Sequence, residues 1–410
     1  MFARKNGGFD AVIGNPPYGA TFDESSQEYL KSKYNCFVWR GESYLIFIEK
    51  ALSLLCHKGL FGYIVPDTYL NLTFTYSLRK MLMDSTRISE VVLLPSKVFS
   101  DAVVDTTLLF YQKIEHSSEY SINVKLFQKN VKINNLAKPD RSYAINSMLW
   151  KKEGTFLVTS TSEEINLISK IEASCKKVSD YAEIFYGIKL YQVGKGVPPQ
   201  TENVRDTKPF SSDRRLSKEF LPFFEGKHIG RYSLSWGNDN WVKYGPWLAE
   251  PRKPEKYQGK KILIRKIVGK TIIATVYPDT SYCNTLLYVL KLHNEEDYLY
   301  SYILGILNSV LIGWYYRHKY QINDSDTFPQ IMIKDISSFP LPAQNNKLEK
   351  KLSSLVEQML ELHRKLSGAK TPHDRTMLER QIAATDGQID RLVYELYGLS
   401  EEEIGLVEGA

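Results

Sequence analysis

Hydrophobic positions over the first third of the chain predict alternating strands and helices. The apolar run Ala11–Ile13 is stopped by Gly14 and two prolines, so it predicts a short buried strand that ends in a rigid loop. Residues 41–57 carry apolar side chains at helical spacing, and residues 60–65 form a second apolar run. The next predicted elements are a helix over 76–83, a strand over 88–94 and an antiparallel strand over 106–113. This order predicts an α/β fold that contains the second half of a doubly wound sheet.

The pattern changes after residue 120. Residues 120–150 are mixed and polar with turn signals, which predicts a domain boundary. Residues 160–175 predict a helix with Thr161 or Ser162 as its N-cap. Short alternations with many Gly, Pro and aromatic residues then predict a β-rich α+β module that ends near residue 342. The last expected elements are helices over 348–366 and 374–397, which form a hairpin, and a mobile tail over 401–410.

Composition narrows the class of partner and compartment. The chain has 410 residues, enough for two or three domains of about 100–200 residues each. A formal net charge of +6 and a pI near 8.8 favour a polyanionic partner. The four cysteines show no C-x-x-C pairing, which argues against a zinc knuckle or a disulfide framework and fits a reducing compartment. No apolar run approaches the roughly 20 residues that span a bilayer, and residues 1–8 lack a signal-peptide core, so we expect a cytoplasmic location.

The tetrapeptide Asn15-Pro16-Pro17-Tyr18 follows the first predicted strand. In open α/β sheets, ligands bind at the carboxyl ends of strands. Two prolines fix φ and hold Asn15 and Tyr18 in defined directions, so an amide acceptor, a carbonyl acceptor and an aromatic ring converge there. That set suits a flat base with an exocyclic amine. The alternative is that the tetrapeptide is only a turn after a strand.

These four residues resemble the catalytic loop of amino-group DNA methyltransferases, the adenine-N6 branch in particular. The resemblance implies that the Asn15 side chain and the Pro16 carbonyl accept hydrogen bonds from the target amine. It also implies that Tyr18 stacks on the flipped-out base and that the methyl group comes from S-adenosylmethionine. Positioning and electrostatics would carry such a reaction, without a metal, after the base has left the duplex.

Residues 60–70, the helix before residue 85 and residues 88–113 resemble the later motifs of Taq-type adenine methyltransferases. This resemblance implies that Phe99 packs against the flipped adenine on the face opposite Tyr18. Stacking is worth about 1–3 kcal/mol per base. The alternative is that Phe99 is a core aromatic residue beside Val98.

The cofactor motifs of the same family are missing. The family binds S-adenosylmethionine with a Gly-rich turn after its first strand and an acidic residue after its second, and too few residues precede Asn15 to hold them. Gly194-Lys195-Gly196 is a weak substitute, because it precedes Val-Pro-Pro-Gln and not a helix. Asn15 is therefore the one candidate cofactor contact, and it is a partial one. We expect a fragment of a longer enzyme or a second polypeptide that completes the sheet, because a half sheet leaves an open edge.

A basic, aromatic stretch lies in the middle of the predicted module. Between Pro251 and Lys270 there are eight basic residues and one acid, Glu255. Basic side chains interleaved with aromatics suit a surface that follows a phosphate backbone. The DNA-binding candidates are Trp247, Arg252, Lys253, Lys256, Lys260, Lys261 and Arg265. The alternative is that the tryptophans are core residues and the lysines form a solvated face.

This module resembles the target-recognition domain of Taq-type and Eco57I-type methyltransferases and of methylase-like phage-exclusion proteins. The resemblance rests on residues 221–229, 244–249, 261–265, 303–309 and 336–342. It implies a double-stranded DNA partner and three domains: the C-terminal half of a methyltransferase domain (1–135), a target-recognition domain (150–342) and a helical hairpin (345–400). The implied function is adenine-N6 methylation in a restriction-modification or phage-defence system. A non-catalytic DNA specificity protein, or a methyltransferase acting on RNA or on a glutamine amide, are the alternatives.

Overall fold

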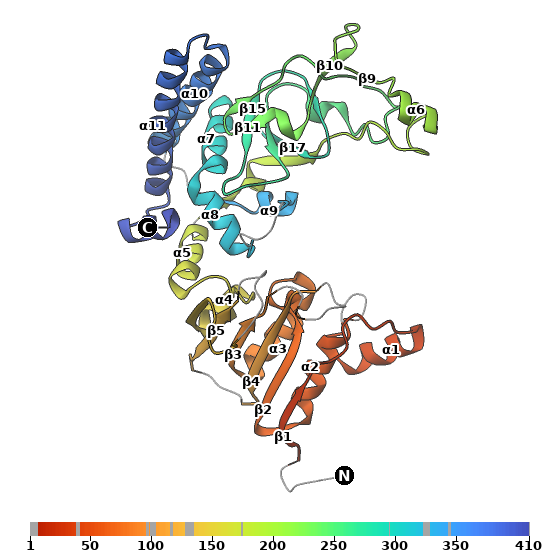
Figure 1. Ribbon diagram of the computed structural model, residues 1–410, viewed down its shortest axis with the longest axis vertical. Coiled ribbons are helices and arrows are strands. Elements are labelled where there is room, and N and C mark those ends of the chain that lie inside the picture. The colour runs from red at the N-terminus through yellow and green to blue at the C-terminus, as the bar shows by residue number, and fades with distance from the viewer. Residues whose placement is uncertain are drawn as a thin grey trace. The chain divides into compact units, whose positions relative to one another are not determined.

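The computed structural model describes most of the chain, and it falls into two compact units. The described residues are 7–37, 42–95, 98, 104–114, 118–127, 135–173, 175–294, 296–322, 329–342 and 346–409. Unit 1 comprises Met1–Ser169 and His318–Ser325, and unit 2 comprises Lys170–Arg317 and Asp326–Ala410 (Figure 1). Each unit is described by itself.

Unit 1 is an α/β unit built on one six-stranded sheet of order β1-β2-β4-β3-β5-β6. Its strands are β1 (Phe9–Gly14), β2 (Leu55–Pro66), β3 (Arg87–Leu93), β4 (Thr106–Gln112), β5 (Ser121–Leu126) and β6 (Arg141–Asn146). Its helices include α1 (Glu24–Lys33), α2 (Ser43–Leu54), α3 (Tyr76–Ser85), α4 (Ser147–Glu153) and α5 (Ser162–Glu172), which continues into unit 2. The pairs β1/β2 and β3/β5 are parallel, and the others are antiparallel. The antiparallel pairing predicted for residues 106–113 is thus confirmed.

Strand β1 differs from its prediction as a buried strand. Phe9 is 56% exposed and Ile13 is 83% exposed. Among the described residues, β1 pairs with β2 alone, and α2 packs against this part of the sheet. A continuous apolar sequence such as Ala11–Ile13 is typical of a strand that is covered on both faces. Here Phe9 and Ile13 are exposed to solvent, and β1 is an edge strand of the described sheet.

The predicted boundary over residues 120–150 also differs from the structure. β5 and β6 occupy this stretch and extend the first sheet, and α4 follows them. Buried Ile122 and Val124 alternate with exposed neighbours along β5, as in a strand with one solvated face. The solvent-facing residues of these strands are polar, and for that reason the sequence pattern predicted a linker where the structure has two strands of the sheet.

Unit 2 joins a β-rich part to a helical part. Its strands are β7 (Lys176–Lys177), β8 (Ala182–Tyr186), β9 (Ser211–Ser212), β10 (Phe220–Phe224), β11 (Ile229–Gly230), β12 (Ser233–Leu234), β13 (Trp241–Lys243), β14 (Lys261–Arg265), β15 (Ala274–Tyr277), β16 (Tyr282–Cys283), β17 (Leu287–Leu292) and β18 (Pro340–Leu341). They form two four-stranded sheets, β16-β10-β13-β9 and β15-β14-β17-β8, with two short pairs. Phe224, Tyr257 and Leu263 belong to one buried core that both sheets share.

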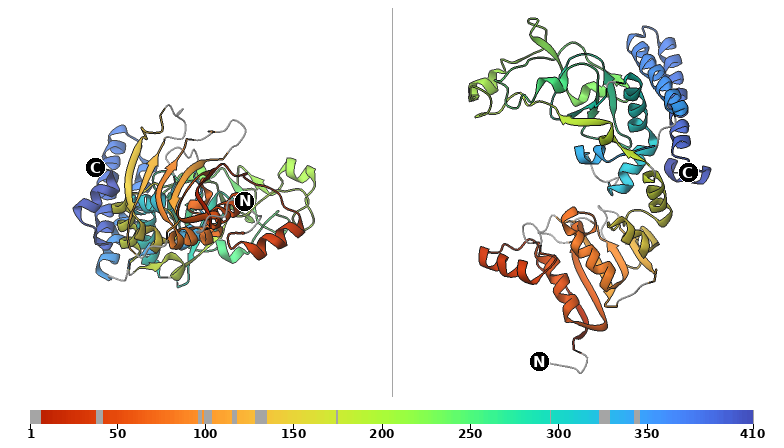
Figure 2. Two further views of the ribbon diagram at one scale, coloured as in Figure 1. Left: turned by 90° about the horizontal axis from the view of Figure 1, so that it is seen from below. Right: turned by 180° about the vertical axis from the view of Figure 1, so that it is seen from behind.

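The helices of unit 2 precede, interrupt and follow its strands along the chain. They are α6 (Glu202–Thr207), α7 (Asp297–Asn308), α8 (Val310–Lys319), α9 (Ile333–Ser337), α10 (Asn346–Gly368), α11 (Pro372–Leu396) and α12 (Glu401–Glu408). α10 and α11 run alongside each other and α10 packs on α7 (Figure 2). The tail expected to be mobile is instead helix α12, which Ser400 caps by accepting a hydrogen bond from the Glu403 backbone N–H. In the described part of the chain, every helix is too short or too polar to cross a bilayer.

Candidate active site and nucleic-acid interface

The Asn15–Tyr18 loop starts where β1 ends, beside the parallel strand β2. Gly14 pairs with Tyr63, and a Cβ atom at Gly14 would stand 3.2 Å from the Tyr63 ring. The loop therefore lies at the carboxyl ends of two adjacent parallel strands, where open α/β sheets bind ligands. Asn15 is exposed and Pro16 is buried.

Two hydrogen bonds from other elements fix this loop. The Ser43 hydroxyl, at the start of α2, donates to the Pro17 carbonyl at 2.6 Å. The same hydroxyl accepts from the Ala20 N–H at 3.4 Å. The Tyr18 hydroxyl donates to the Ile64 carbonyl on β2 at 3.0 Å. Sequence reasoning missed Ser43, which lies far from the loop along the chain and belongs to no motif.

These two hydrogen bonds, which together we call the clamp, leave two acceptors of the loop without a partner among the described residues. Within the described residues, neither the Asn15 side-chain amide nor the Pro16 carbonyl has a hydrogen-bond partner, whereas the Pro17 carbonyl is taken by Ser43. Burial raises the pKa of the Tyr18 phenol, so its ring is neutral at physiological pH. The loop thus offers two neutral acceptors and one neutral ring, a set that can hold an amine without titrating.

The segment after the loop is anchored at both ends. Asp23 caps α1 by accepting from the Ser26 N–H at 2.7 Å, and these hydrogen bonds lower the pKa of Asp23. At the far end, the Glu49 carboxylate of α2 accepts from the backbone N–H groups of Asn35 and Cys36, at 3.0 and 2.8 Å. α1 itself buries none of its residues, so it stands out from the sheet.

Phe99 lies outside the described residues, so its pairing with Tyr18 around a base stays a prediction.

The residues that the structure describes do not form a complete S-adenosylmethionine site. The predicted substitute turn, Gly194–Gly196, belongs to unit 2 and packs on the Trp247 carbonyl, so it is no part of the unit 1 sheet. At the carboxyl end of β1, Asn15 is the candidate contact that sequence reasoning assigned. The described residues hold no cluster of three metal-ligating side chains.

The structure corrects one DNA-binding candidate, Lys261. Its side chain is fully buried, and its ammonium donates to the carbonyls of Gly259 and Asp279, at 2.7 and 2.5 Å. Burial lowers its pKa to about 7. Lys261 begins β14 with its side chain turned inward, so it is not available to a phosphate. Its neighbour Lys260 is paired with Asp297 at 2.9 Å.

Other candidates gather around the end of β8. The Arg252 guanidinium lies 5.7 Å from the Tyr186 ring and contacts Glu250 at 2.5 Å. The Lys256 ammonium lies 3.8 Å from the Phe185 ring. Lys253 is exposed and Arg265 is half-buried. Arg252 and Lys256 thus lie against aromatic rings, as the sequence pattern suggested.

Trp247 serves mainly in packing. It is half-buried, its ring lies 5.7 Å from the Phe210 ring, and its N–H donates to the Lys243 carbonyl at 3.2 Å. This matches the alternative in which the tryptophan is a core residue.

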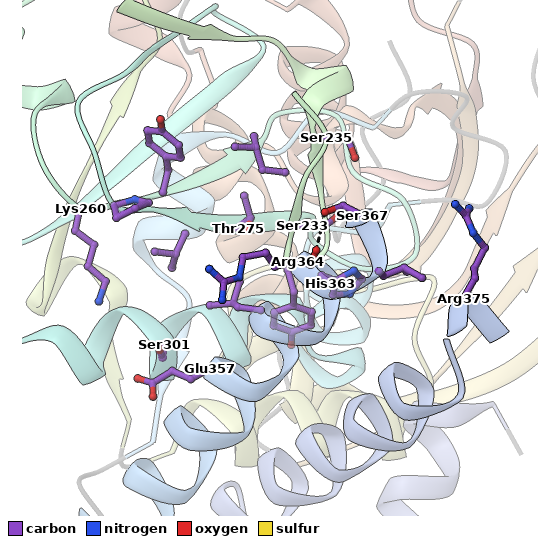
Figure 3. A pocket seen from close by; sticks show the side chains of 17 residues that line it. Ser233, Ser235, Lys260, Thr275, Ser301, Glu357, His363, Arg364, Ser367 and Arg375 are labelled. Carbon is purple, nitrogen blue, oxygen red and sulfur yellow. Dashed lines mark hydrogen bonds between the residues drawn. The ribbon is translucent and has the colours of Figure 1, made fainter. Parts of the chain in front are cut away.

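A cavity of about 790 Å³ lies within unit 2, between the β-rich part and α10 (Figure 3). Lys260 and Arg375 lie at opposite sides of the view, with His363 and Arg364 between them. Arg364 is paired with Glu361 at 2.6 Å, and burial lowers the pKa of His363. The cations are dispersed and partly paired, so this cavity has no focused anion site.

Comparison with known families gives one match for the N-terminal part of the chain and another for the β-rich part of unit 2. Residues 1–99 match the family described as "Eco57I restriction-modification methylase". Residues 221–341 match the family described as "TaqI-like C-terminal specificity domain". Two segments of the chain thus resemble the Taq- and Eco57I-type restriction-modification family. The resemblance drawn from the sequence is thereby confirmed.

Individual relatives agree with these matches. A protein of Methanocaldococcus jannaschii named "Putative type II restriction enzyme and methyltransferase" is 26% identical over 396 residues, covering 96% of this chain and 31% of that protein. Type II restriction enzyme and methyltransferase RM.Eco57I of Escherichia coli is 28% identical over 193 residues, covering 45% of this chain and 17% of that protein. The chain therefore spans less than a third of the length of these relatives.

A solved structure shares the fold. The Type IIL restriction-modification enzyme MmeI, solved in complex with DNA, superposes with a TM-score of 0.53 at 12% identity. The match covers 97% of this chain and 56% of that chain.

Proposed function

We propose that this chain carries the target-amine loop and the DNA-recognition module of an adenine-N6 DNA methyltransferase in a restriction-modification or phage-defence system. The observation that carries the proposal is the clamped loop. Ser43 and the Ile64 carbonyl hold the Asn15–Tyr18 loop by its Pro17 carbonyl and its phenol, so the Asn15 amide and the Pro16 carbonyl stay open to an amine. The three-domain division at 1–135, 150–342 and 345–400 belongs to this proposal.

In this proposal the chain positions the target and polarises it. The Asn15 amide oxygen and the Pro16 carbonyl accept the two amine hydrogens, which moves electron density onto the nitrogen and aims its lone pair. Tyr18 supplies a neutral ring for the flipped base, and Phe99 would cover the other face. S-adenosylmethionine supplies the methyl group when it is bound.

In this proposal the cofactor half comes from elsewhere, in the same or in a second polypeptide. Phe9 and Ile13 of β1 expose apolar surface, and so does Leu60 of β2, which is 56% exposed and pairs with Ala11. Bare apolar surface beside an unpaired strand edge is what a further strand and a covering helix would bury. The open edge of β1 supports this completion.

A second candidate is a DNA specificity protein without catalysis. The same exposed edge of β1 favours it, because the described residues lack a complete cofactor site. The two candidates share the recognition module and differ in whether methyl transfer occurs.

The first test is calorimetric titration of S-adenosylmethionine into this chain alone. Micromolar binding would show that this chain holds a cofactor site and would overturn completion from elsewhere. A folded chain that binds DNA and not the cofactor would support the recognition candidate, or a partner that completes the sheet.

The decisive variant is Asn15→Ala in an assembly that transfers methyl groups. We expect loss of at least about 100-fold in transfer, since one preorganised hydrogen bond to the reacting group is removed, with DNA affinity unchanged. N6-methyladenine is measured by mass spectrometry of digested DNA. The matched control is Asn123→Ala, an exposed asparagine on β5 of the same sheet. Equal transfer by Asn15→Ala, or loss of both transfer and DNA binding, would contradict the proposal.

A further inference from the structure

The Gly194-Lys195-Gly196 turn has no part in the proposed methyl transfer, yet it forms an ordered loop in unit 2. Gly194 and Gly196 have φ angles of +79° and +88°, which L side chains rarely adopt. The loop presents apolar side chains to solvent: Val193 is 44% exposed and Val197 is 70% exposed. Lys195 stands between them and is also exposed.

Buried hydrogen bonds hold this loop, residues 193–200, in one shape. The Gln200 side chain is buried, and its amide nitrogen donates to the carbonyls of Leu190 and Trp247, both at 2.8 Å. Its amide oxygen accepts from the Gln192 N–H at 2.8 Å. The Val197 N–H donates to the Pro246 carbonyl, also at 2.8 Å. A loop fixed this way loses little conformational entropy when it binds a partner.

The loop lies beside the basic, aromatic segment. A Cβ atom at Gly196 would stand 2.5 Å from the Trp247 carbonyl oxygen, so the two backbones touch. Just before the loop, Lys189 pairs with Glu250 in an antiparallel bridge. Glu250 leads directly to Arg252 and Lys253. Segments some 50 residues apart in sequence thus build one surface, with an apolar tip and cations at its base.

We propose that the loop of residues 193–200 is a reading finger that enters a groove of duplex DNA. Val197 contacts base edges, as apolar side chains contact the thymine methyl group in the major groove, and Lys195 contacts a phosphate beside it. Lys253, which is exposed, neutralises a neighbouring phosphate, while Arg252 is paired with Glu250. The cations at the base favour duplex DNA over a protein surface as the occupant. This inference rests on the proposed recognition function and specifies which element reads the sequence.

The test selects bound sequences from a pool of short DNA duplexes with a randomised centre, using the full chain. Affinity for the selected duplex is then measured by fluorescence anisotropy at several salt concentrations. For Val197→Ser we expect about tenfold weaker binding, an altered base preference and an unchanged salt dependence. For Lys195→Gln we expect weaker binding with a shallower salt dependence, by about one unit of slope. The control is Met377→Ser, which removes an exposed apolar side chain from α11.

The possible outcomes distinguish failure of the proposed reading finger from failure of the proposed DNA-recognition function. A selected site bound equally by wild type and by Val197→Ser overturns the finger and leaves DNA recognition standing. Absence of any duplex binding by the folded wild-type chain contradicts the proposed function itself. Equal competition by duplex RNA overturns the finger too, since a deep, narrow A-form groove cannot admit it.

Discussion

The two units carry similar apolar runs but bury them very differently. In unit 1, β1 leaves Phe9 and Ile13 largely in solvent, while in unit 2 the apolar residues of β10 and β14 enter one core. Apolar burial stabilises by about 25 cal/mol per Å², so β1 adds little stability on its own. The difference indicates that the core of unit 2 is closed, whereas the end of the sheet that bears the Asn15–Tyr18 loop leaves apolar surface exposed.

The largest expected contrast comes from one substitution made in both places. Phe224→Ala should lower the free energy of unfolding of unit 2 by about 3–5 kcal/mol, because the ring is fully buried. Phe9→Ala should change unit 1 by less than about 0.5 kcal/mol. Hydrogen exchange of peptides from each unit under denaturant reports both values. A cost of several kcal/mol for Phe9→Ala would show that β1 is already covered in solution.

A buried acid should make unit 2 respond to pH. Burial raises the pKa of Asp390 on α11 to about 6, while its carboxylate accepts from the Val310 N–H at 2.9 Å and faces Asp386, Arg231 and Glu408. The folded unit therefore binds the proton more tightly than the unfolded chain. This contribution is present below about pH 4 and is lost as the pH rises through 6, by about 3 kcal/mol in all.

Asp390→Asn keeps the acceptor and removes the titration. We expect it to stabilise unit 2 by about 3 kcal/mol at pH 7 and to have little effect at pH 4. Urea unfolding at both pH values measures the difference. Glu379→Gln, on the exposed side of the same helix, is the control and should change the stability of unit 2 by less than about 0.5 kcal/mol. A destabilised Asp390→Asn variant at pH 7 would mean that the charged form is the one the fold favours.

The sequence predicted what local patterns encode. The strand before Asn15, the helix α3 and the antiparallel strand β4 all follow from spacing and punctuation in short windows. The tertiary neighbours of a strand or helix cannot be inferred from such local patterns. The letters of Ala11–Ile13 are the same whether a neighbouring strand covers them or not, so the exposure of β1 could not be predicted.

The side-chain contacts of the sites were hidden for the same reason. Lys260 and Lys261 are adjacent in the sequence. Only the register of β14 turns the Lys261 side chain inward and leaves Lys260 at the surface, where it is paired with Asp297. The Gly194–Gly196 turn was compared with cofactor turns because its contact with Trp247 is formed between distant segments.

The smallest expected effect tests the hydrogen bond from Ser43 that holds the Asn15–Tyr18 loop. Ser43→Ala removes the donor to the Pro17 carbonyl and should cost unit 1 about 1 kcal/mol, the usual net value of one hydrogen bond. Ser53→Ala, on the exposed side of the same helix, removes only a bond to its own helix carbonyl and should cost less than about 0.5 kcal/mol. Urea unfolding of unit 1 compares the two variants. Equal costs would mean that the loop keeps its shape through its prolines and the Tyr18 hydroxyl, and that Ser43 belongs to α2 alone.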